Sequence, residues 1–374
     1  MRMAYVTELR QSTLGVHVRR EMAAMRRLGH TVDQWNGCDE TAGWSDAPAD
    51  TVAGPWLAPV RAFLAMAGHP ALAMRFAKLA ARAVRTAPRP DCVVACGAGM
   101  PAYLGQTFAR LWRVPFFVNV YGPDVFQSWE PGLAALCRAA GVMAPSELVR
   151  GRADMLMRGS NHIPTVLHEG VPDAFLDAVR PESTPMRLVF IGRIVRTKGL
   201  HVLLDALPEI RQRIPEIEIR VLGDGPLRPD FERFVVHNGL DRSVTFLGDC
   251  SEDTVLVELL QARAACVPSV HADDGAVDGI PVALLEAMAA ECPVIASDAG
   301  GIPEVVENFK TGRLVPAGDM KALAETVPSV MLAAGSARKC AQAGRTLIRE
   351  RFRLEDAVRR KVAFMEEAVS NAAG

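Results

Sequence analysis

The sequence lacks a surplus of charge of either sign. Its 374 residues carry 42 Lys and Arg side chains against 43 Asp and Glu, which gives a formal net charge of −1 at pH 7. A dedicated nucleic-acid binder needs a basic surplus to neutralise phosphates, so we expect no nucleic-acid partner. The apolar fraction of 49% and the charged fraction of 23% are ordinary for globular proteins and argue against a disordered or fibrous chain.

Closely spaced cysteines and long apolar runs are also missing. The eight cysteines are scattered, and no pair has the two-residue spacing of zinc knuckles or redox sites. A chain of this length does not need disulfides, so we expect reduced thiols and a cytoplasmic location. The most hydrophobic window, residues 56–74, is interrupted by two prolines, an arginine and a histidine. We therefore expect a soluble protein, or one bound peripherally at the inner face of a membrane.

Short apolar runs alternate with helical patterns along almost the whole chain. The pattern predicts five strands in the first half and six in the second, separated by amphipathic helices. Such alternation is typical of parallel sheets covered by helices on both faces, which is an α/β architecture. The length predicts two such domains at about 150 residues each.

A stretch with two prolines and no periodicity, residues 177–185, predicts the linker between the domains. The first domain is then expected over residues 1–176 and the second over 186–352. A final helix in 353–374 carries an apolar face that either caps the second domain or crosses back to the first. Ligands of open α/β sheets bind outside the carboxyl ends of the strands, so two facing domains predict a cleft with one substrate on each side.

The segment from Phe190 to Leu200 places two cations at the end of a buried strand. The strand ends at Gly192, Arg193 follows, and Lys198 stands just before the next helix. Cations beside a helix N-terminus suit a diphosphate, because both the field and the N–H donors favour an anion. A solvated basic loop is the alternative interpretation of the same residues.

A second segment, residues 268–289, runs from a strand through an acidic loop into a helix that begins near Pro281. Glu286 is the only acid on that apolar helix, and a lone buried carboxylate is costly without a partner. The hydroxyls of a ribose would be one partner, and an unseen Arg or Lys another. Further on, Gly300 and Gly301 at a strand end indicate either a close ligand or close packing of backbone.

Taken in order, these segments resemble the donor domain of the family 4 retaining glycosyltransferases, which have the GT-B fold. The resemblance covers residues 186–328, and residues 168–175 are similar to the family's exit from the first domain. It implies an enzyme that moves a hexose-type sugar from a UDP- or GDP-linked donor to a hydroxyl of a glycan, lipid-linked or small-molecule acceptor. Polysaccharide or secondary-metabolite biosynthesis is the implied setting, with no cofactor and no metal.

The resemblance also implies roles for single residues of the second domain. Arg193 and Lys198 would hold the donor diphosphate at Gly192 and offset the charge that develops on it. Asp278 stands where the family has the first glutamate of its Glu–seven residues–Glu motif, which implies a catalytic position in contact with the donor sugar, and Glu286 matches the second glutamate, which binds the ribose. The remaining implied donor contacts are Gly279, Ile280, Gly300, Gly301 and Glu304.

The first domain resembles the family less closely. Gly15 lies in a segment similar to the family's first glycine-containing loop, near the donor phosphates. Tyr121 replaces a histidine of the family's His-Gly-x-Asp segment, whereas Asp124 is retained. Both are expected to bind the acceptor, with a helix N-cap as the alternative for Asp124.

Residues 51–90 contain six basic side chains and no acid. Within them, residues 60–86 predict an amphipathic helix that either docks on an anionic membrane or is simply a solvated outer helix. In the second half, Asp273 and Asp274 are adjacent acids without a supporting ligand set, so we assign no metal site.

Two other classes of protein fit parts of the sequence. A GT-B sugar-nucleotide epimerase would use carboxylates without an acceptor, and a non-catalytic nucleotide-sugar-binding protein would explain Asp278 and Tyr121. A nicotinamide dehydrogenase is disfavoured, because the first strand is not followed by the spaced glycines of that fingerprint.

Overall fold

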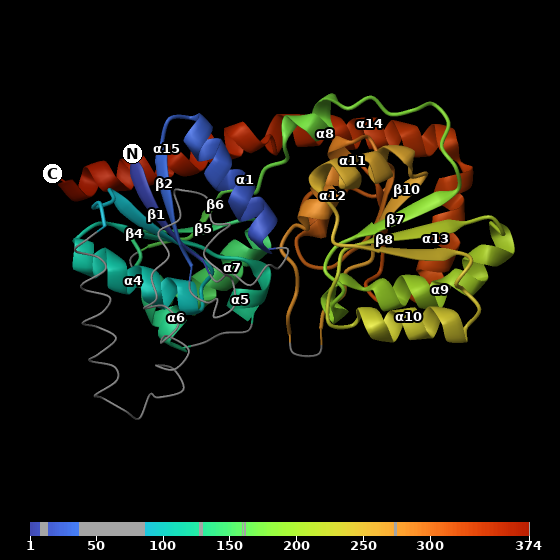
Figure 1. Ribbon diagram of the computed structural model, residues 1–374, viewed down its shortest axis with the longest axis horizontal. Helices are drawn as coiled ribbons and strands as arrows, with labels where there is room; N and C mark the ends of the chain where they lie inside the picture. The colour runs from blue at the N-terminus through green and yellow to red at the C-terminus, as the bar shows by residue number, and fades with distance from the viewer. Residues whose placement is uncertain are drawn as a thin grey trace. The chain divides into compact units, whose positions relative to one another are not determined.

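The computed structural model describes residues 1–7, 14–36, 87–126, 130–158, 160, 162–272 and 275–373. The chain divides into two compact units. Unit 1 comprises Met1–His168 together with Val358–Gly374, and unit 2 comprises Glu169–Ala357. Each unit is a parallel sheet with helices on both faces (Figure 1), which confirms the predicted α/β architecture.

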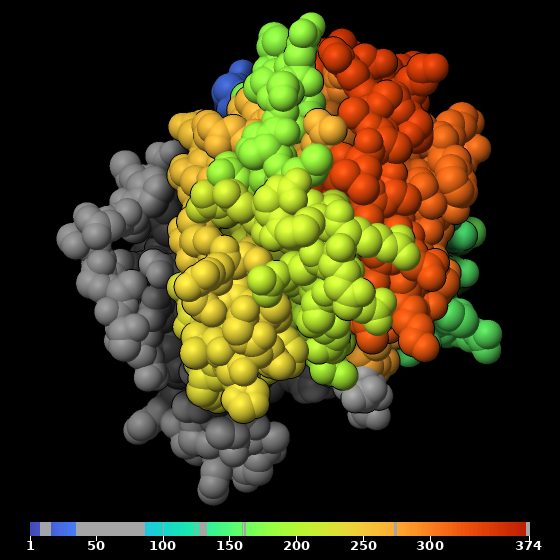
Figure 2. Space-filling view, turned by 90° about the vertical axis from the view of Figure 1, so that its right-hand side faces the viewer, coloured from blue at the N-terminus to red at the C-terminus, as the bar shows by residue number. Residues whose placement is uncertain are grey.

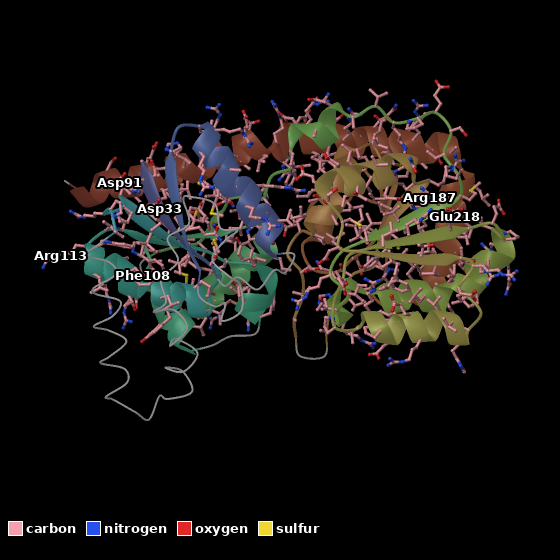
Figure 3. All side chains as sticks on the ribbon, viewed as in Figure 1. Asp33, Asp91, Phe108, Arg113, Arg187 and Glu218 are labelled. Atoms are coloured by element: carbon pink, nitrogen blue, oxygen red, sulfur yellow. The ribbon has the colours of Figure 1, made fainter. Side chains whose placement is uncertain are left out.

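Unit 1 is built on six parallel strands in the order β2-β1-β3-β4-β5-β6. The sequence predicted five of them and missed β2. That strand lies at the sheet edge and consists mainly of polar residues, and its Asp33 pairs with Arg2 of β1 at 2.8 Å. Figure 3 labels Asp33 on this strand. The bounds are β1 (Arg2–Thr7), β2 (Thr31–Asn36), β3 (Cys92–Cys96), β4 (Phe116–Asn119), β5 (Gly141–Ala144) and β6 (Thr165–Val166).

The two faces of the unit 1 sheet pack against different helices. Ala4 and Val6 of β1 join one apolar core with α4 (Met100–Trp112), α6 (Glu130–Leu136) and α7 (Glu147–Leu156), whereas Tyr5 faces α1 (Leu14–Arg27) and α15 (Leu354–Ala373) (Figure 1). A short helix, α5 (Gly122–Phe126), follows β4.

The face that carries Tyr5 also holds a buried ion pair. Lys361 Nζ of α15 lies 2.5 Å from Glu21 Oε2 of α1, and the two side chains are only 2% and 4% exposed. Glu21 Oε1 accepts hydrogen bonds from the Tyr5 hydroxyl at 2.7 Å and from Asn119 Nδ2 at 3.4 Å. Burial, followed by the charge of Glu21, raises the pKa of Tyr5 well above its ordinary value. The pair therefore fixes α15 to α1 in the interior of unit 1.

Unit 2 also has six parallel strands, in the order β12-β11-β10-β7-β8-β9. All six were predicted from their apolar runs. Their bounds are β7 (Arg187–Ile191), β8 (Glu218–Leu222), β9 (Val244–Gly248), β10 (Ala264–Val267), β11 (Val294–Ser297) and β12 (Arg313–Val315).

Helices cover both faces of the unit 2 sheet. One core contains Leu188 and Phe190 with α9 (Leu200–Arg213), α10 (Arg228–His237) and α13 (Met320–Leu332). The opposite core contains Val189 with α8 (Asp173–Asp177), α11 (Glu252–Gln261), α12 (Val282–Ala289) and α14 (Ala334–Arg351), of which α8 and α14 were not predicted. Figure 2 shows residues 200–250 (yellow-green to yellow) side by side with residues 320–350 (orange-red) on one face of this unit.

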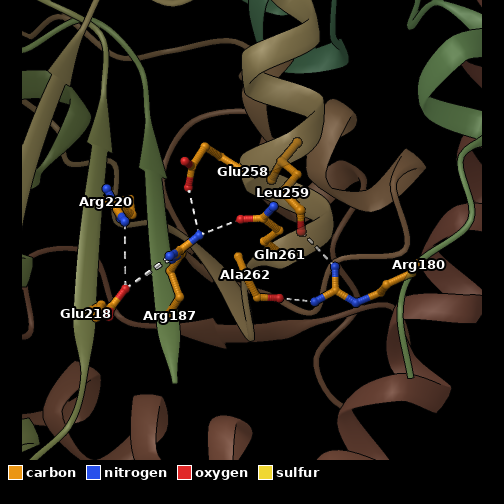
Figure 4. Close-up of polar contacts among 8 residues, drawn as sticks. All are labelled: Arg180, Arg187, Glu218, Arg220, Glu258, Leu259, Gln261 and Ala262. Carbon is orange, nitrogen blue, oxygen red and sulfur yellow. Dashed lines mark hydrogen bonds and ion pairs between the residues drawn. The ribbon is translucent and has the colours of Figure 1, made fainter. Parts of the chain in front are cut away.

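Polar contacts join the amino end of β7 to its neighbours (Figure 4). The guanidinium of Arg187 lies 3.2 Å from the carboxylate of Glu218 and 3.4 Å from that of Glu258, and it donates to Gln261 at 2.8 Å. Arg187 and Glu218 lie at the amino edge of the sheet (Figure 3). These contacts tie β7 to β8 and α11 at the amino edge of the sheet.

The chain first passes from unit 1 to unit 2 between His168 and Glu169, ahead of residues 177–185 where the sequence predicts a linker. The reason is that Val171, Phe175 and Leu176 are buried in a core of unit 2. Residues 177–185 connect α8 to β7 inside that unit. The chain returns to unit 1 within α15, whose residues from Val358 onward belong to unit 1.

The buried pair in unit 1 yields a stability prediction. Lys361→Met leaves the Glu21 carboxylate buried without its cation, so we expect unit 1 to lose about 3–5 kcal/mol of unfolding free energy. Calorimetry of the intact chain measures this as a lowered transition temperature. In the matched control, Glu147→Gln breaks the exposed pair between Glu147 and Arg150 and is expected to change little. Equal effects of the two substitutions would contradict the assignment.

Candidate active site

The order of strands singles out one place at the carboxyl edge of the unit 2 sheet. From β7 the chain continues to β8 on one side, and β10 pairs with β7 on the other. The crossovers therefore leave in opposite directions, and ligands of α/β sheets bind at such a switch point. The loops that follow β7 and β10 begin here.

These two loops meet in an ion pair. Lys198, on a single helical turn (Arg196–Lys198) after β7, places Nζ 2.7 Å from Oδ2 of Asp278, which follows β10. The side chains are 24% and 14% exposed, so both are partly withdrawn from water. The structure thus brings together two of the three residues predicted to be catalytic. It does not bring Arg193 into this pair, because the side chain of Arg193 is exposed.

Ser269 is a further polar residue of this site, and the sequence analysis missed it. Its hydroxyl lies 3.5 Å from the same Oδ2 atom of Asp278, and the residue is 1% exposed. The Ser297 hydroxyl at the end of β11 donates to the Ser269 carbonyl. The position of Ser269, two residues after a buried strand of a parallel sheet, was the available signal, since the carboxyl ends of such strands collect functional side chains.

Backbone packing holds the Lys198 turn in place. Gly199 has a φ of +70°, and a Cβ there would lie 1.7 Å from the Pro268 carbonyl oxygen. The Val270 N–H donates to the Thr197 carbonyl at 2.9 Å. Only glycine allows this close approach, so the loops after β7 and β10 are fixed to each other.

Gly192 lies under the side chain of Lys198. A Cβ at Gly192 would be 3.7 Å from Cδ of Lys198. The carbonyl oxygen of Gly192 would lie 2.1 Å from a Cβ placed at Gly223. The lysine stem is thus in ordinary contact over Gly192, and it is Gly223 whose missing side chain allows the two backbones to approach closely. The contact of Gly192 with the donor diphosphate remains a prediction.

The glycine pair Gly300–Gly301 packs against the backbone of the Asp278 loop. A Cβ at Gly300 would be 2.1 Å from the Asp278 carbonyl oxygen, and Gly301 N–H donates to the Gly279 carbonyl at 3.0 Å. Close backbone packing, one of the two predicted alternatives, accounts for both glycines. This packing fixes the segment from Asp278 to Ile280 ahead of helix α12.

The other predicted donor contacts lie on elements that leave the same edge. Glu286 is buried on α12 at 6% exposure. Ile280 is buried and Gly279 partly exposed just before that helix, and Glu304 ends the turn that follows Gly301. Their roles in binding a nucleotide stay predictions.

In unit 1, the predicted acceptor residues lie at the carboxyl ends of β3 and β4. The Asp124 carboxylate accepts hydrogen bonds from the Ala98 N–H at 2.6 Å and from the Tyr121 N–H at 2.7 Å. Tyr121 is buried, and its ring meets the ring of His17 edge-on, with centroids 5.3 Å apart. Asp124 is the third residue of α5 and therefore not its N-cap; its carboxylate instead joins the segment after β3 to the residue that precedes α5. Gly15 is the second residue of α1, and its contact with the donor phosphates remains a prediction.

Some predictions fall outside the described residues, namely the basic helix in 60–86 and the acids Asp273 and Asp274. Across the described ranges, no three or more His, Cys, Asp or Glu side chains are grouped as ligands of a metal ion. None of the helices in those ranges combines the length and apolarity that a membrane span requires.

Asp124 yields a prediction about pH. Burial raises the pKa of Asp124 from 3.8 to about 7, against the opposing effect of the backbone N–H groups that it accepts. Between pH 4 and pH 7 the folded protein therefore binds a proton that the unfolded chain has released, so this group's contribution to stability is lost as the pH rises through about 7.

Asp124→Asn removes that titration. We expect the transition temperature of the variant, relative to that of the original protein, to rise between about pH 4 and pH 7 and to level off above pH 7 in calorimetric scans. Parallel pH profiles of the two proteins would contradict a raised pKa at this position.

Part of unit 2 is similar to a known protein family. Residues 174–347 match the model of the glycosyl transferases group 1 family. The putative colanic acid biosynthesis glycosyltransferase WcaL of Escherichia coli strain K12 is 30% identical over 225 residues, which are 59% of this chain and 55% of WcaL. The alpha-D-kanosaminyltransferase of Streptomyces kanamyceticus is 23% identical over 261 residues, 63% of this chain and 66% of that protein. The matched part thus spans about half the length of WcaL and two-thirds or less of the second enzyme.

Solved structures resemble the whole chain in fold. HepE of Anabaena, crystallised in complex with UDP, superposes with a TM-score of 0.75 over 98% of this chain and all of that one, at 17% identity. Sucrose-phosphate synthase of Thermosynechococcus elongatus gives a TM-score of 0.76 at 19% identity, over 99% and 100% of the two chains. Together with the two parallel sheets, the solved structures show that the chain has the GT-B fold, and residues 174–347 within it are similar to the glycosyl transferases group 1 family.

Proposed function

We propose that the protein is a retaining glycosyltransferase of family 4 that takes a hexose-type sugar from a nucleotide diphosphate sugar. The acceptor is a hydroxyl of a glycan, a lipid-linked intermediate or a small molecule. The observation that carries the proposal is the position of Lys198, whose Nζ lies at the switch point of the unit 2 sheet, next to the carboxylate of Asp278. A cation and a carboxylate there suit the diphosphate and the sugar of one donor.

The relatives support this reaction class and the donor. WcaL is named for colanic acid biosynthesis, and the Streptomyces kanamyceticus enzyme for the transfer of kanosamine. HepE was crystallised with UDP and with UDP-glucose. We infer a role in the biosynthesis of a surface polysaccharide or a secondary metabolite.

Each group then has a part in the reaction. The bond between the anomeric carbon and the β-phosphate oxygen breaks, and the acceptor oxygen bonds to the same face of that carbon. The acceptor proton passes to the leaving phosphate. Lys198 and the exposed Arg193 offset the negative charge that grows on the diphosphate. We propose that these protein cations hold the diphosphate without a metal ion.

Binding of the donor is the first test. We expect one of UDP, GDP and ADP to raise the transition temperature of unit 2, with no change when EDTA is added, because ligand binding to the folded state stabilises it by about 2.7 kcal/mol at one hundred times Kd. Lys198→Met should make this shift markedly smaller without removing it. Lys310→Met, which removes an exposed lysine paired with Glu307, is the matched control and should retain it.

Turnover separates an enzyme from a binding protein. With the nucleotide sugar that binds, we expect slow hydrolysis or transfer, reduced about 10²–10³-fold in kcat by Lys198→Met. Binding without transfer or hydrolysis would favour the non-catalytic alternative, and isomerised donor sugar would favour an epimerase. Unchanged turnover in the Lys198 variant would contradict the assigned role.

A further inference from the structure

The ion pair between Lys198 and Asp278 raises a question about charge. A nucleotide diphosphate is an anion, yet the cation proposed to receive it already has a carboxylate at 2.7 Å. Both partners are partly withdrawn from water, at 24% and 14% exposure, so their attraction is stronger than that of a surface pair. An entering diphosphate therefore has to compete with Asp278 for the ammonium group.

The acid is the fixed member of the pair. The hydroxyl of the buried Ser269 lies 3.5 Å from Oδ2 of Asp278, and the Ser297 hydroxyl holds the Ser269 carbonyl. Gly300 packs so closely on the Asp278 backbone that a Cβ there would lie 2.1 Å from the Asp278 carbonyl oxygen. Asp278 is thus held from its side chain and from its backbone.

The lysine is the adaptable member. Its four-carbon stem lies over Gly192, where the position of a Cβ would be 3.8, 3.7 and 3.9 Å from Cγ, Cδ and Cε, so the stem is in ordinary van der Waals contact and is not tightly enclosed on this side. A lysine ammonium carries three donors on rotatable bonds, so it can turn to a second anion while its backbone stays in place. Because Asp278 is held in place and Lys198 can turn, an entering anion can replace the Asp278 carboxylate as the partner of Lys198 Nζ.

We infer that Asp278 is a positioning residue that holds Lys198 in a neutral pair until a nucleotide diphosphate replaces the carboxylate at Nζ. This inference rests on the proposed function of the site. After transfer of the sugar, the return of Lys198 to Asp278 competes with the bound nucleoside diphosphate and so favours its release. Asp278 accordingly weakens the affinity for the diphosphate while keeping the cation in place.

Calorimetric titration with the free nucleoside diphosphate tests the exchange, because that ligand lacks the transferred hexose that would contact Asp278. Asp278→Asn removes the competing charge at nearly constant size. We expect it to lower Kd about fivefold, which corresponds to the upper end of what a solvent-accessible ion pair contributes. Glu258→Gln removes a carboxylate of similar burial that pairs with Arg187 at the opposite edge, and it is expected to leave Kd unchanged.

A double variant separates exchange from simple charge repulsion. In a Lys198→Met background, Asp278→Asn should give no gain in affinity, because no cation is left for the carboxylate to hold. A gain that persists in that background, or an unchanged or higher Kd in Asp278→Asn alone, would overturn the inference. If UDP, GDP and ADP bind neither the original protein nor Asp278→Asn, both the inference and the proposed function are contradicted. If one of them binds the original protein and Asp278→Asn leaves its Kd unchanged, only the inference about Asp278 is contradicted.

Discussion

The candidate site depends on close packing between the backbones of loops at one sheet edge. Gly199 packs against Pro268 and Gly300 against Asp278 at distances that exclude any Cβ. Because the strands are parallel, their carboxyl ends are adjacent, and this packing converts that proximity into a fixed geometry. The separation of 2.7 Å between Lys198 and Asp278 follows from it. A side chain at either glycine would move the charged groups without touching them.

The two units place their buried or partly buried ion pairs differently. In unit 1, Lys361 and Glu21 lie in the interior between two helices, where the carboxylate also accepts the Tyr5 hydroxyl. A fully buried pair costs desolvation and serves to fix one arrangement of elements. In unit 2, Lys198 and Asp278 remain partly exposed at the edge, where an incoming anion can reach them. The same pairing of lysine with a carboxylate therefore holds a helix in one unit and is available for ligand exchange in the other.

Much of the fold followed from the periodicity of apolar residues. All six strands of unit 2 were predicted, because buried parallel strands are continuous apolar runs. The edge strand β2 was missed, since its Asp33 and Gln34 interrupt that pattern and its stability comes from pairing with β1. Of the site, Lys198 and Asp278 were found through motif order. Their contact spans 80 positions of sequence and depends on β10 lying beside β7, which no local pattern encodes. The support from Ser269 was missed for the same reason.

A crystal structure with the nucleoside diphosphate bound tests the central claim most directly. The account predicts the diphosphate at the carboxyl ends of β7 and β10, with a phosphate oxygen within about 3 Å of Lys198 Nζ and the contact to Asp278 lengthened. A nucleotide bound elsewhere on the chain, or one bound at this edge with Lys198 pointing away from the phosphates, would contradict it.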